Sequence, residues 1–359
     1  MSDHLLLGTR KGLLFYERTD AGWRLAREEF RGIPISYAIR DPRDGVLWAA
    51  QDNGHWGPKL QRSRDNGETW EEIILPKYPE GAEITEGNPA NLSYIWAVFP
   101  GSPSRPERVY LGTEPGGLFQ SDDGGQSFEL VEGLWNHPSR MKHWFGGGRD
   151  HPGLHSLVID PADDDHMFVG ISVAGVFETR DGGVSWQPRN QGLKANYLPD
   201  PDAEVGHDPH CLVASPADPE VMIQQNHCGI FWSNDGARSW SEVSEAGGPA
   251  FFGFAIAADE LDPATAWVVP AVSDELRLAV DGSLCVCRTQ DRGRTWQALR
   301  KGLPQKDCYD YAYRHALDIR GDRLAFGTTS GNLYLSDDRG DSWATLAGNL
   351  PMIYSVRFL

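Results

Sequence analysis

The sequence predicts an all-β fold, a single seven-bladed β-propeller with four strands in each blade, from three observations. An eight-residue pattern recurs six times along the chain. Short apolar strands precede each copy, and the nearest of them often opens with glycine. The two ends of the chain together contain the strands of one more unit. Regularly spaced strands and turns of this kind are typical of propeller blades.

The repeated pattern is Ser/Thr-x-Asp-x-Gly-x-Ser/Thr-aromatic, and we call each copy an octapeptide turn. The copies cover residues 63–70, 121–128, 179–186, 233–240, 289–296 and 336–343. In such a turn the aspartate accepts hydrogen bonds from nearby amides, the glycine adopts positive φ, and the aromatic residue packs as an anchor. Ala237 stands where glycine is expected, which predicts a strained turn in that copy.

Each octapeptide turn is placed between the third and fourth strands of a blade, all within one domain, residues 1–359. The predicted blades cover 4–30 with 352–359, 34–76, 91–132, 153–192, 209–247, 250–301 and 312–348. The N-terminal blade lacks its first strand, and residues 353–359 are the strand that completes it. This pairing closes the ring and removes exposed sheet edges.

Composition limits the classes of function. Forty glycines, 24 prolines and 13 tryptophans suit many short strands joined by turns. A formal charge of −18 argues against binding to nucleic acids or membrane surfaces, because both need a positive field. The N-terminus has no basic run followed by a long apolar segment, which predicts a cytoplasmic protein. Five cysteines without a metal-type pair predict reduced thiols.

The octapeptide resembles the Asp-box of bacterial sialidases, xyloglucanase-type glycoside hydrolases, sortilin-type receptors and photosystem assembly propellers. From residues 8–12 onward, Gly-Thr-Arg-Lys-Gly, the chain looks like bacterial BNR-repeat proteins described as glycosyl hydrolases or exo-α-sialidases. The resemblance implies a propeller with structural Asp-boxes, while activity varies among such proteins. Residues 30–34, Phe-Arg-Gly-Ile-Pro, differ from the sialidase Phe/Tyr-Arg-Ile-Pro motif by one glycine, so true sialidase activity is not expected.

Loops alternate between the two ends of a blade. The octapeptide end carries the turns between first and second and between third and fourth strands. The loop end carries the other connections, which include the long segments 77–92, 132–153, 192–209 and 302–314. Most of the histidines map to the loop ends, which predicts a ligand site there.

Four histidines and a glutamate are the central candidates. His155, His210 and His315 open innermost strands, whereas His227 and Glu114 end second strands. Imidazoles with a carboxylate bind a divalent metal ion or transfer protons, and both alternatives are kept for this cluster. The predicted metal ligands are His155, His210, His227 and His315.

The other candidates are acids, bases and ligand contacts at the loop ends. The predicted catalytic residues are Glu114, His155, His210, His227, Asp310, Tyr313 and His315. The predicted substrate contacts are Arg10, Trp56, Arg140, Trp144, Arg149 and Arg314. The arginines are expected to hold a carboxylate, sulfate or phosphate, and the tryptophans to stack on a ligand.

Two functions follow from this pattern. The first is a hydrolase or lyase that acts on a small polar or anionic, sugar-like molecule at the loop ends. The second is a non-catalytic binding or assembly propeller that uses the same surface for a partner. Convergent His, Glu and Arg side chains around a polar pocket favour the enzyme, and a flat apolar surface favours the scaffold.

Overall fold

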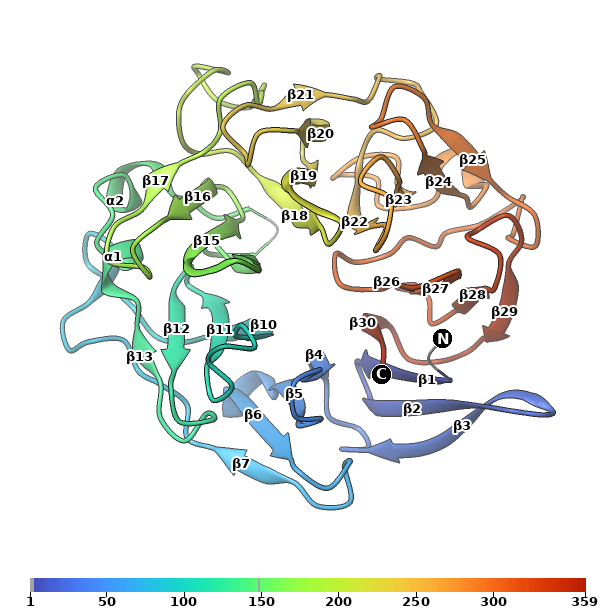
Figure 1. Cartoon of the computed structure of the whole chain (residues 1–359), viewed down its shortest axis with the longest axis horizontal. Coiled ribbons are helices and arrows are strands. Elements are labelled where there is room, and N and C mark those ends of the chain that lie inside the picture. Colours follow the sequence, from blue (N-terminus) through green and yellow to red (C-terminus); the bar gives the residue numbers. More distant parts are fainter. Residues whose placement is uncertain (1–2, 148) are drawn as a thin grey trace. The chain divides into compact units, whose positions relative to one another are not determined.

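A computed structural model describes residues 3–147 and 149–359, and nearly all of its regular structure is β. Seven four-stranded antiparallel sheets are the blades of a β-propeller, which confirms the predicted fold class (Figure 1). Contacts group the chain into two compact units, Met1–Ile35 with His210–Leu359 and Ser36–Pro209. The two units are described one at a time, and the prediction of a single domain stays a prediction.

The first unit contains four blades. Their strands are β3 (Gly22–Glu29), β2 (Gly12–Thr19), β1 (His4–Thr9) and β30 (Ile353–Phe358); β18 (Pro209–Ser215), β19 (Asp218–Asn226), β20 (Gly229–Ser233) and β21 (Ser241–Glu242); β22 (Gly253–Ala258), β23 (Ala266–Pro270), β24 (Val286–Thr289) and β25 (Gln297–Leu299); and β26 (Leu317–Arg320), β27 (Arg323–Gly327), β28 (Leu333–Ser336) and β29 (Ala344–Ala347). A 3-10 helix, η2 (Val280–Gly282), precedes β24.

The second unit contains three blades. Their strands are β4 (Ile35–Arg40), β5 (Leu47–Asp52), β6 (Pro58–Ser63) and β7 (Glu71–Ile73); β10 (Tyr94–Pro100), β11 (Val109–Glu114), β12 (Leu118–Ser121) and β13 (Glu129–Leu130); and β14 (Leu154–Asp160), β15 (Asp163–Ile171), β16 (Gly175–Thr179) and β17 (Gln187–Pro188). Between blades lie η1 (Gly54–Trp56), the hairpin β8 (Glu83–Thr85) and β9 (Asn88–Pro89), α1 (Glu132–Trp135) and α2 (Arg140–His143).

The last strand completes the first blade, as predicted. β30 pairs antiparallel with β1, and Leu7 lies opposite Val356 in the register. Ile353, Val356 and Phe358 are buried in the same core cluster as Leu7. Burial of apolar side chains on this strand therefore stabilises a pairing between the two ends of the chain.

The octapeptide turns share one hydrogen-bond pattern. In the copy at 121–128, the Asp123 carboxylate accepts hydrogen bonds from the Ser127 amide at 2.9 Å and the Ser127 hydroxyl at 2.6 Å. The equivalent aspartates make the same two contacts in the other copies. Ala237 adopts a φ of +59° in its turn. This left-handed backbone conformation is unfavourable for alanine, as expected for that copy.

Five hydrophobic core clusters of the described chain each lie between two consecutive blades of a unit. The glycine at the fifth position of the turn makes this packing close. A Cβ atom at Gly183 would lie 2.8 Å from Val131 Cγ1, and one at Gly293 would lie 2.5 Å from Val243 Cβ. Glycine at these positions therefore lets a turn approach the fourth strand of the preceding blade.

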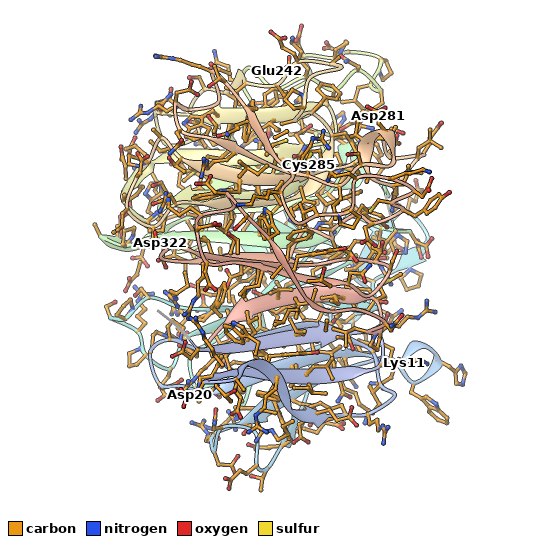
Figure 2. The ribbon with its side chains drawn as sticks, turned by 90° about the vertical axis from the view of Figure 1, so that its right-hand side faces the viewer. Lys11, Asp20, Glu242, Asp281, Cys285 and Asp322 are labelled. Carbon is orange, nitrogen blue, oxygen red and sulfur yellow. The ribbon has the colours of Figure 1, made fainter. Side chains whose placement is uncertain are left out.

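Loops alternate between the ends of the blades as expected. In the first unit, Asp20 and Asp322 lie in turns at the octapeptide ends, while Lys11 and Asp281 lie at the opposite, loop ends (Figure 2). No helix within residues 3–147 and 149–359 has the length and apolar character needed to cross a lipid bilayer.

Candidate functional site

A buried carboxyl group lies at the loop end of the second unit. Glu114 is the last residue of β11, and its side chain is 3% exposed. Its Oε2 atom accepts a hydrogen bond from Arg149 Nε at 2.6 Å. Burial raises the pKa of Glu114 above its ordinary value, although Arg149 acts in the opposite direction. A carboxyl group with a raised pKa is suited to donate a proton at mild pH.

Arg149 connects this carboxyl group to an aromatic surface. Its guanidinium group lies 4.1 Å from the centre of the Tyr94 ring. Burial acts to lower the pKa of Arg149, but the charges of Glu114, Tyr94 and Asp52 raise it overall. The side chain is 39% exposed, and in the described part of the chain its Nη atoms have no hydrogen-bond partner. These two nitrogen atoms are available to a ligand.

Aromatic side chains continue from Tyr94 along the same loop ends. Tyr94 and Trp96 form a T-shaped pair with centroids 4.9 Å apart, and His155 lies 6.4 Å from Trp96. His155 Nε2 is 2.7 Å from the Pro209 carbonyl oxygen, and Nδ1 is 2.9 Å from Ser156 Oγ. Because a carbonyl oxygen only accepts, Nε2 carries the proton, and both ring nitrogens are engaged within the protein.

Three predicted ligand contacts of this unit lie in different environments. Trp56 is 81% exposed in η1, beyond the end of β5. Trp144 is buried against Phe177, with ring centroids 5.1 Å apart. Arg140 is buried above the Trp135 ring and donates to the Glu83 and Ile84 carbonyl oxygens at 2.9 and 3.0 Å. Trp144 and Arg140 therefore hold the loop in place, and Trp56 offers a free aromatic face.

In the first unit, two of the predicted histidines lie together. The rings of His210 and His227 are 5.7 Å apart in a T-shaped arrangement. His210 Nδ1 donates to the Gly253 carbonyl oxygen at 2.6 Å, which leaves Nε2 as the unprotonated nitrogen. His227 Nε2 lies 3.7 Å from a carboxylate oxygen of Asp274. In the described chain, neither His155 nor His315 belongs to a group of three metal-ligating side chains that are close together.

A row of aromatic rings extends from His210 in β18 to Tyr354 in β30 within the first unit. His210 stacks on Phe254 at 4.6 Å, and Phe254 contacts Tyr311 at 5.9 Å. Tyr311 contacts Tyr313 at 5.4 Å, and Tyr313 stacks on Tyr354 at 5.7 Å. Burial, together with the neighbouring Tyr313, raises the pKa of Tyr311. Tyr311 is therefore a neutral hydrogen-bonding group at physiological pH.

Of the remaining candidates of this unit, Asp310 and Arg314 make structural contacts with their side chains. Asp310 is buried and accepts hydrogen bonds from Thr328 Oγ1, Asn332 Nδ2 and Tyr334 Oη at 2.9 to 3.3 Å. Arg314 Nε donates to the His210 carbonyl oxygen at 2.7 Å. The His315 carbonyl oxygen accepts from the Val356 amide at 3.0 Å, and Arg10 is exposed in the turn between β1 and β2.

Sequence reasoning on histidines and charges missed Tyr94 and Trp96, and it placed Asp52 at the loop end without choosing it as a site residue. The signal was nonetheless present in the strand pattern. Tyr94 opens the innermost strand β10, in the same way that His155 and His210 lie at the starts of β14 and β18. Asp52 ends the second strand β5, as Glu114 ends β11. A search for every polar or aromatic residue at the start of a first strand or the end of a second strand would have found them.

Comparisons with known proteins agree on the fold. No protein-family model matches the chain. An oligoxyloglucan-reducing end-specific xyloglucanase of Emericella nidulans is 27% identical over 199 residues, which are 50% of this chain and 22% of that protein. Xyloglucanase Xgh74A of Acetivibrio thermocellus is 28% identical over 160 residues, 41% of this chain and 18% of that protein. The chain thus spans about a fifth of the length of these curated relatives.

Solved structures give the same architecture. An ancestral GH74 enzyme superposes with a TM-score of 0.61 at 18% identity, over 88% of this chain and 38% of that one. YCF48 from Cyanidioschyzon merolae superposes with a TM-score of 0.56 at 14% identity, over 92% and 95% of the two chains. YCF48 bound to a D1 peptide gives 0.50 at 16% identity, over 86% and 83%. At these identities the similarity shows the fold.

Proposed function

We propose that the chain is a glycoside hydrolase that acts on a saccharide at the loop ends of the second unit. The observation that carries this proposal is the buried Glu114, which is paired with the partly exposed Arg149 above the ring of Tyr94. The sequence relatives named xyloglucanases support a saccharide substrate. We also infer that the octapeptide turns are Asp-boxes with a structural role, because their aspartates bond within their own turns.

Each residue of this group has a chemical role in the proposal. Glu114 in its acid form donates its proton to the glycosidic oxygen as the bond from that oxygen to the sugar C1 breaks. Water adds to C1 and transfers a proton to the carboxylate of Asp52. The free Nη atoms of Arg149 hydrogen-bond to sugar hydroxyl or carboxylate oxygens. Trp56 stacks on a sugar ring.

The proposal is tested by the release of reducing ends from xyloglucan oligosaccharides. The Glu114→Gln variant keeps the shape of the protonated side chain but has no proton to donate, so the rate should fall by about 100-fold or more. Because burial raises the pKa of Glu114, the wild-type rate should fall as the pH rises through that pKa. The exposed Glu86 of the same unit provides a control, and Glu86→Gln should keep the wild-type rate. An unchanged rate in Glu114→Gln would contradict the proposal.

A second candidate function is non-catalytic binding of a polypeptide at the same loop ends. The exposed Trp56 favours it, as does the match to a peptide-bound YCF48 over most of both chains. In this case the wild-type protein binds its ligand without cleaving saccharides, and Trp56→Ala weakens binding while Glu114→Gln leaves it intact. Cleavage of xyloglucan oligosaccharides by the wild-type protein therefore distinguishes the two candidate functions.

A further inference from the structure

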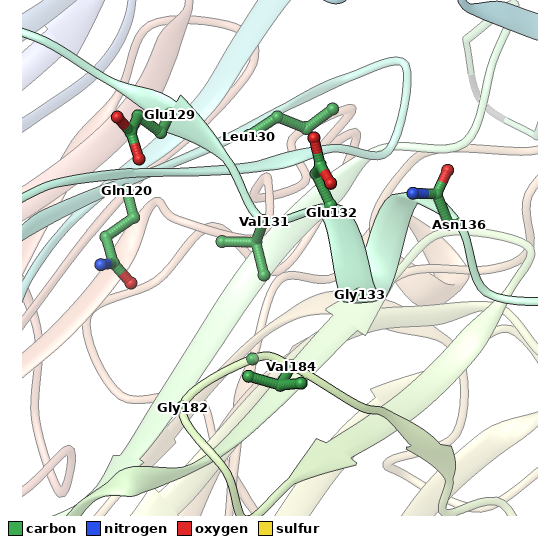
Figure 3. A pocket seen from close by; sticks show the side chains of 10 residues that line it. Gln120, Glu129, Leu130, Val131, Glu132, Gly133, Asn136, Gly182 and Val184 are labelled. Atoms are coloured by element: carbon green, nitrogen blue, oxygen red, sulfur yellow. The ribbon is translucent and has the colours of Figure 1, made fainter.

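A surface hollow of about 500 Å³ lies between two blades of the second unit, away from Glu114. One wall is formed by β13 and the start of α1, and the other by the octapeptide turn between β16 and β17. Val131 and Val184 lie on these two walls, and the carboxylates of Glu129 and Glu132 lie at the upper side of the view in Figure 3. The hollow thus combines an apolar surface with two acidic groups.

Val184 is an exception among the octapeptide turns. The equivalent residues in the other five copies are polar or charged: Glu68, Gln126, Arg238, Arg294 and Asp341. Val184 is 77% exposed, so its methyl groups are in contact with water. A single exposed apolar residue is ordinary, but this one lines a hollow and replaces a polar residue of the repeat. A ligand with an aliphatic part would remove this surface from water.

Among the residues that the structure describes, the acidic groups of the hollow have no basic side chain opposite them, whereas the equivalent glutamate of the neighbouring blade has one. In the register between β6 and β7, Arg62 lies opposite Glu71, and their side chains form an ion pair at 2.8 Å. In the register between β12 and β13, Gln120 lies opposite Glu129, and the Gln120 amide donates to Asp122 instead. In the described chain, no hydrogen bond or ion pair is made by the carboxylates of Glu129 and Glu132.

A hollow of the same design in the first unit contains the missing charge. It measures about 390 Å³ and is lined by Glu242, Val243 and the turn that contains Gly293. Its octapeptide turn has Arg294 where the second unit has Val184. Of these two hollows, the one in the second unit is therefore the one with no basic side chain in its lining.

We propose that the hollow between β13 and the turn at Val184 binds an arginine side chain of a partner polypeptide. The aliphatic stem of the arginine packs between Val131 and Val184, and its guanidinium group bonds to Glu129 and Glu132. Arginine suits the site because its planar group donates to two carboxylates at once and its stem is apolar. This site is separate from the proposed hydrolase site, so either can exist without the other.

The test uses methyl NMR spectra of the whole chain and a capped hexapeptide with one arginine among glycines and serines. We expect saturable shifts of the Val131 and Val184 methyl signals. The same peptide with citrulline keeps the shape but has no charge, and it should bind at least tenfold more weakly. Higher salt should also weaken the binding of the arginine peptide, because it screens the attraction between opposite charges.

Two variants rebuild the internal cation and should block the site. Gln120→Arg copies the Arg62 arrangement, and Val184→Arg copies the hollow of the first unit. Each should weaken binding by tenfold or more, with unchanged melting temperature. Glu242→Gln alters the other hollow and serves as the matched control, with unchanged binding. Equal binding of the citrulline peptide, full binding in Gln120→Arg, or tighter binding of spermidine than of the peptide would overturn the proposal.

Discussion

Asp123 illustrates how one side chain organises a whole octapeptide turn. Its carboxylate accepts a hydrogen bond from the Ser121 hydroxyl at 2.7 Å, in addition to the two from Ser127. The amide of Gln126 donates to the same carboxylate at 2.9 Å. The hydroxyl and amide of Ser127 are the main reasons why the pKa of Asp123 falls to about 2. The ionised form therefore stabilises the turn.

Replacing Asp123 with alanine should lower the free energy of unfolding by about 1 kcal/mol or somewhat more at pH 7, through lost hydrogen bonds. A carboxylate whose pKa is lower in the folded protein stabilises the fold above its unfolded pKa of about 4. That contribution disappears as the pH falls to about 2. The difference between wild type and Asp123→Ala, measured by urea unfolding, should therefore shrink from pH 5 toward pH 3.

The control is Asp123→Asn, which keeps an acceptor oxygen and should lose less stability than alanine. Hydrolysis or ligand binding at the loop ends, per folded molecule, should not change in either variant, because the turn lies at the octapeptide end. A variant that folds normally but loses hydrolysis or ligand binding at the loop ends would contradict the assignment of the two ends.

At residue scale, the sequence predicts at which strand ends the candidate residues lie but not the contacts of their side chains. Strand order alone predicts that Glu114 and His210 lie at loop ends. It does not show that both ring nitrogens of His155 are engaged, because those partners are a carbonyl and a hydroxyl that carry no sequence signal. Trp144 and Arg140 were predicted to contact ligand, and their burial depends on the fold of an irregular loop.

At the scale of elements, strands were predictable and inter-blade segments were not. A strand followed by an octapeptide turn is specified by local chemistry, so β12 or β16 follows from a few residues. The short helices α1 and α2 have no repeated counterpart, and each contains only four residues. Their conformation depends on packing against neighbouring segments, such as Arg140 over Trp135.

Removing residues 353–359 tests the most unusual element of the fold. The deletion exposes the edge of β1 and removes the buried side chains of Ile353, Val356 and Phe358. Each such loss costs roughly 2–5 kcal/mol, so the total approaches the stability of an ordinary domain. We expect a large fall in melting temperature and loss of folded protein at 37 °C, measured by circular dichroism.

The control for this deletion is Tyr354→Ala, which changes a partly exposed side chain and keeps the strand. It should melt much closer to the wild type than the truncated chain does. If the truncated chain melts like the intact protein, the pairing of β30 with β1 does not stabilise the fold.

At the scale of the whole molecule, the two ends of the chain are neighbours within the first unit. The Leu359 amide donates to the His4 carbonyl oxygen at 3.1 Å. The blade that contains both ends is held by hydrogen bonds and apolar contacts, and no covalent link joins β30 to β1. The pairing of β30 with β1 should therefore not depend on where the chain begins and ends. A chain with its ends moved elsewhere can test this expectation.

A circular permutant provides this test. A flexible linker of about four residues joins Leu359 to Asp3, since each residue spans up to about 3.5 Å. New ends are opened between Ala246 and Gly247, in an exposed loop where no atom lies within 4 Å of a Cβ built on Gly247. Because every strand keeps its partners, the permutant should melt within about 5 °C of the wild type. A second permutant, opened between the buried Ile223 and Gln224 of β19, should fail to fold because the break interrupts a core strand. Collapse of the first permutant, in which every strand is intact, would show that chain connectivity and not strand pairing stabilises this blade.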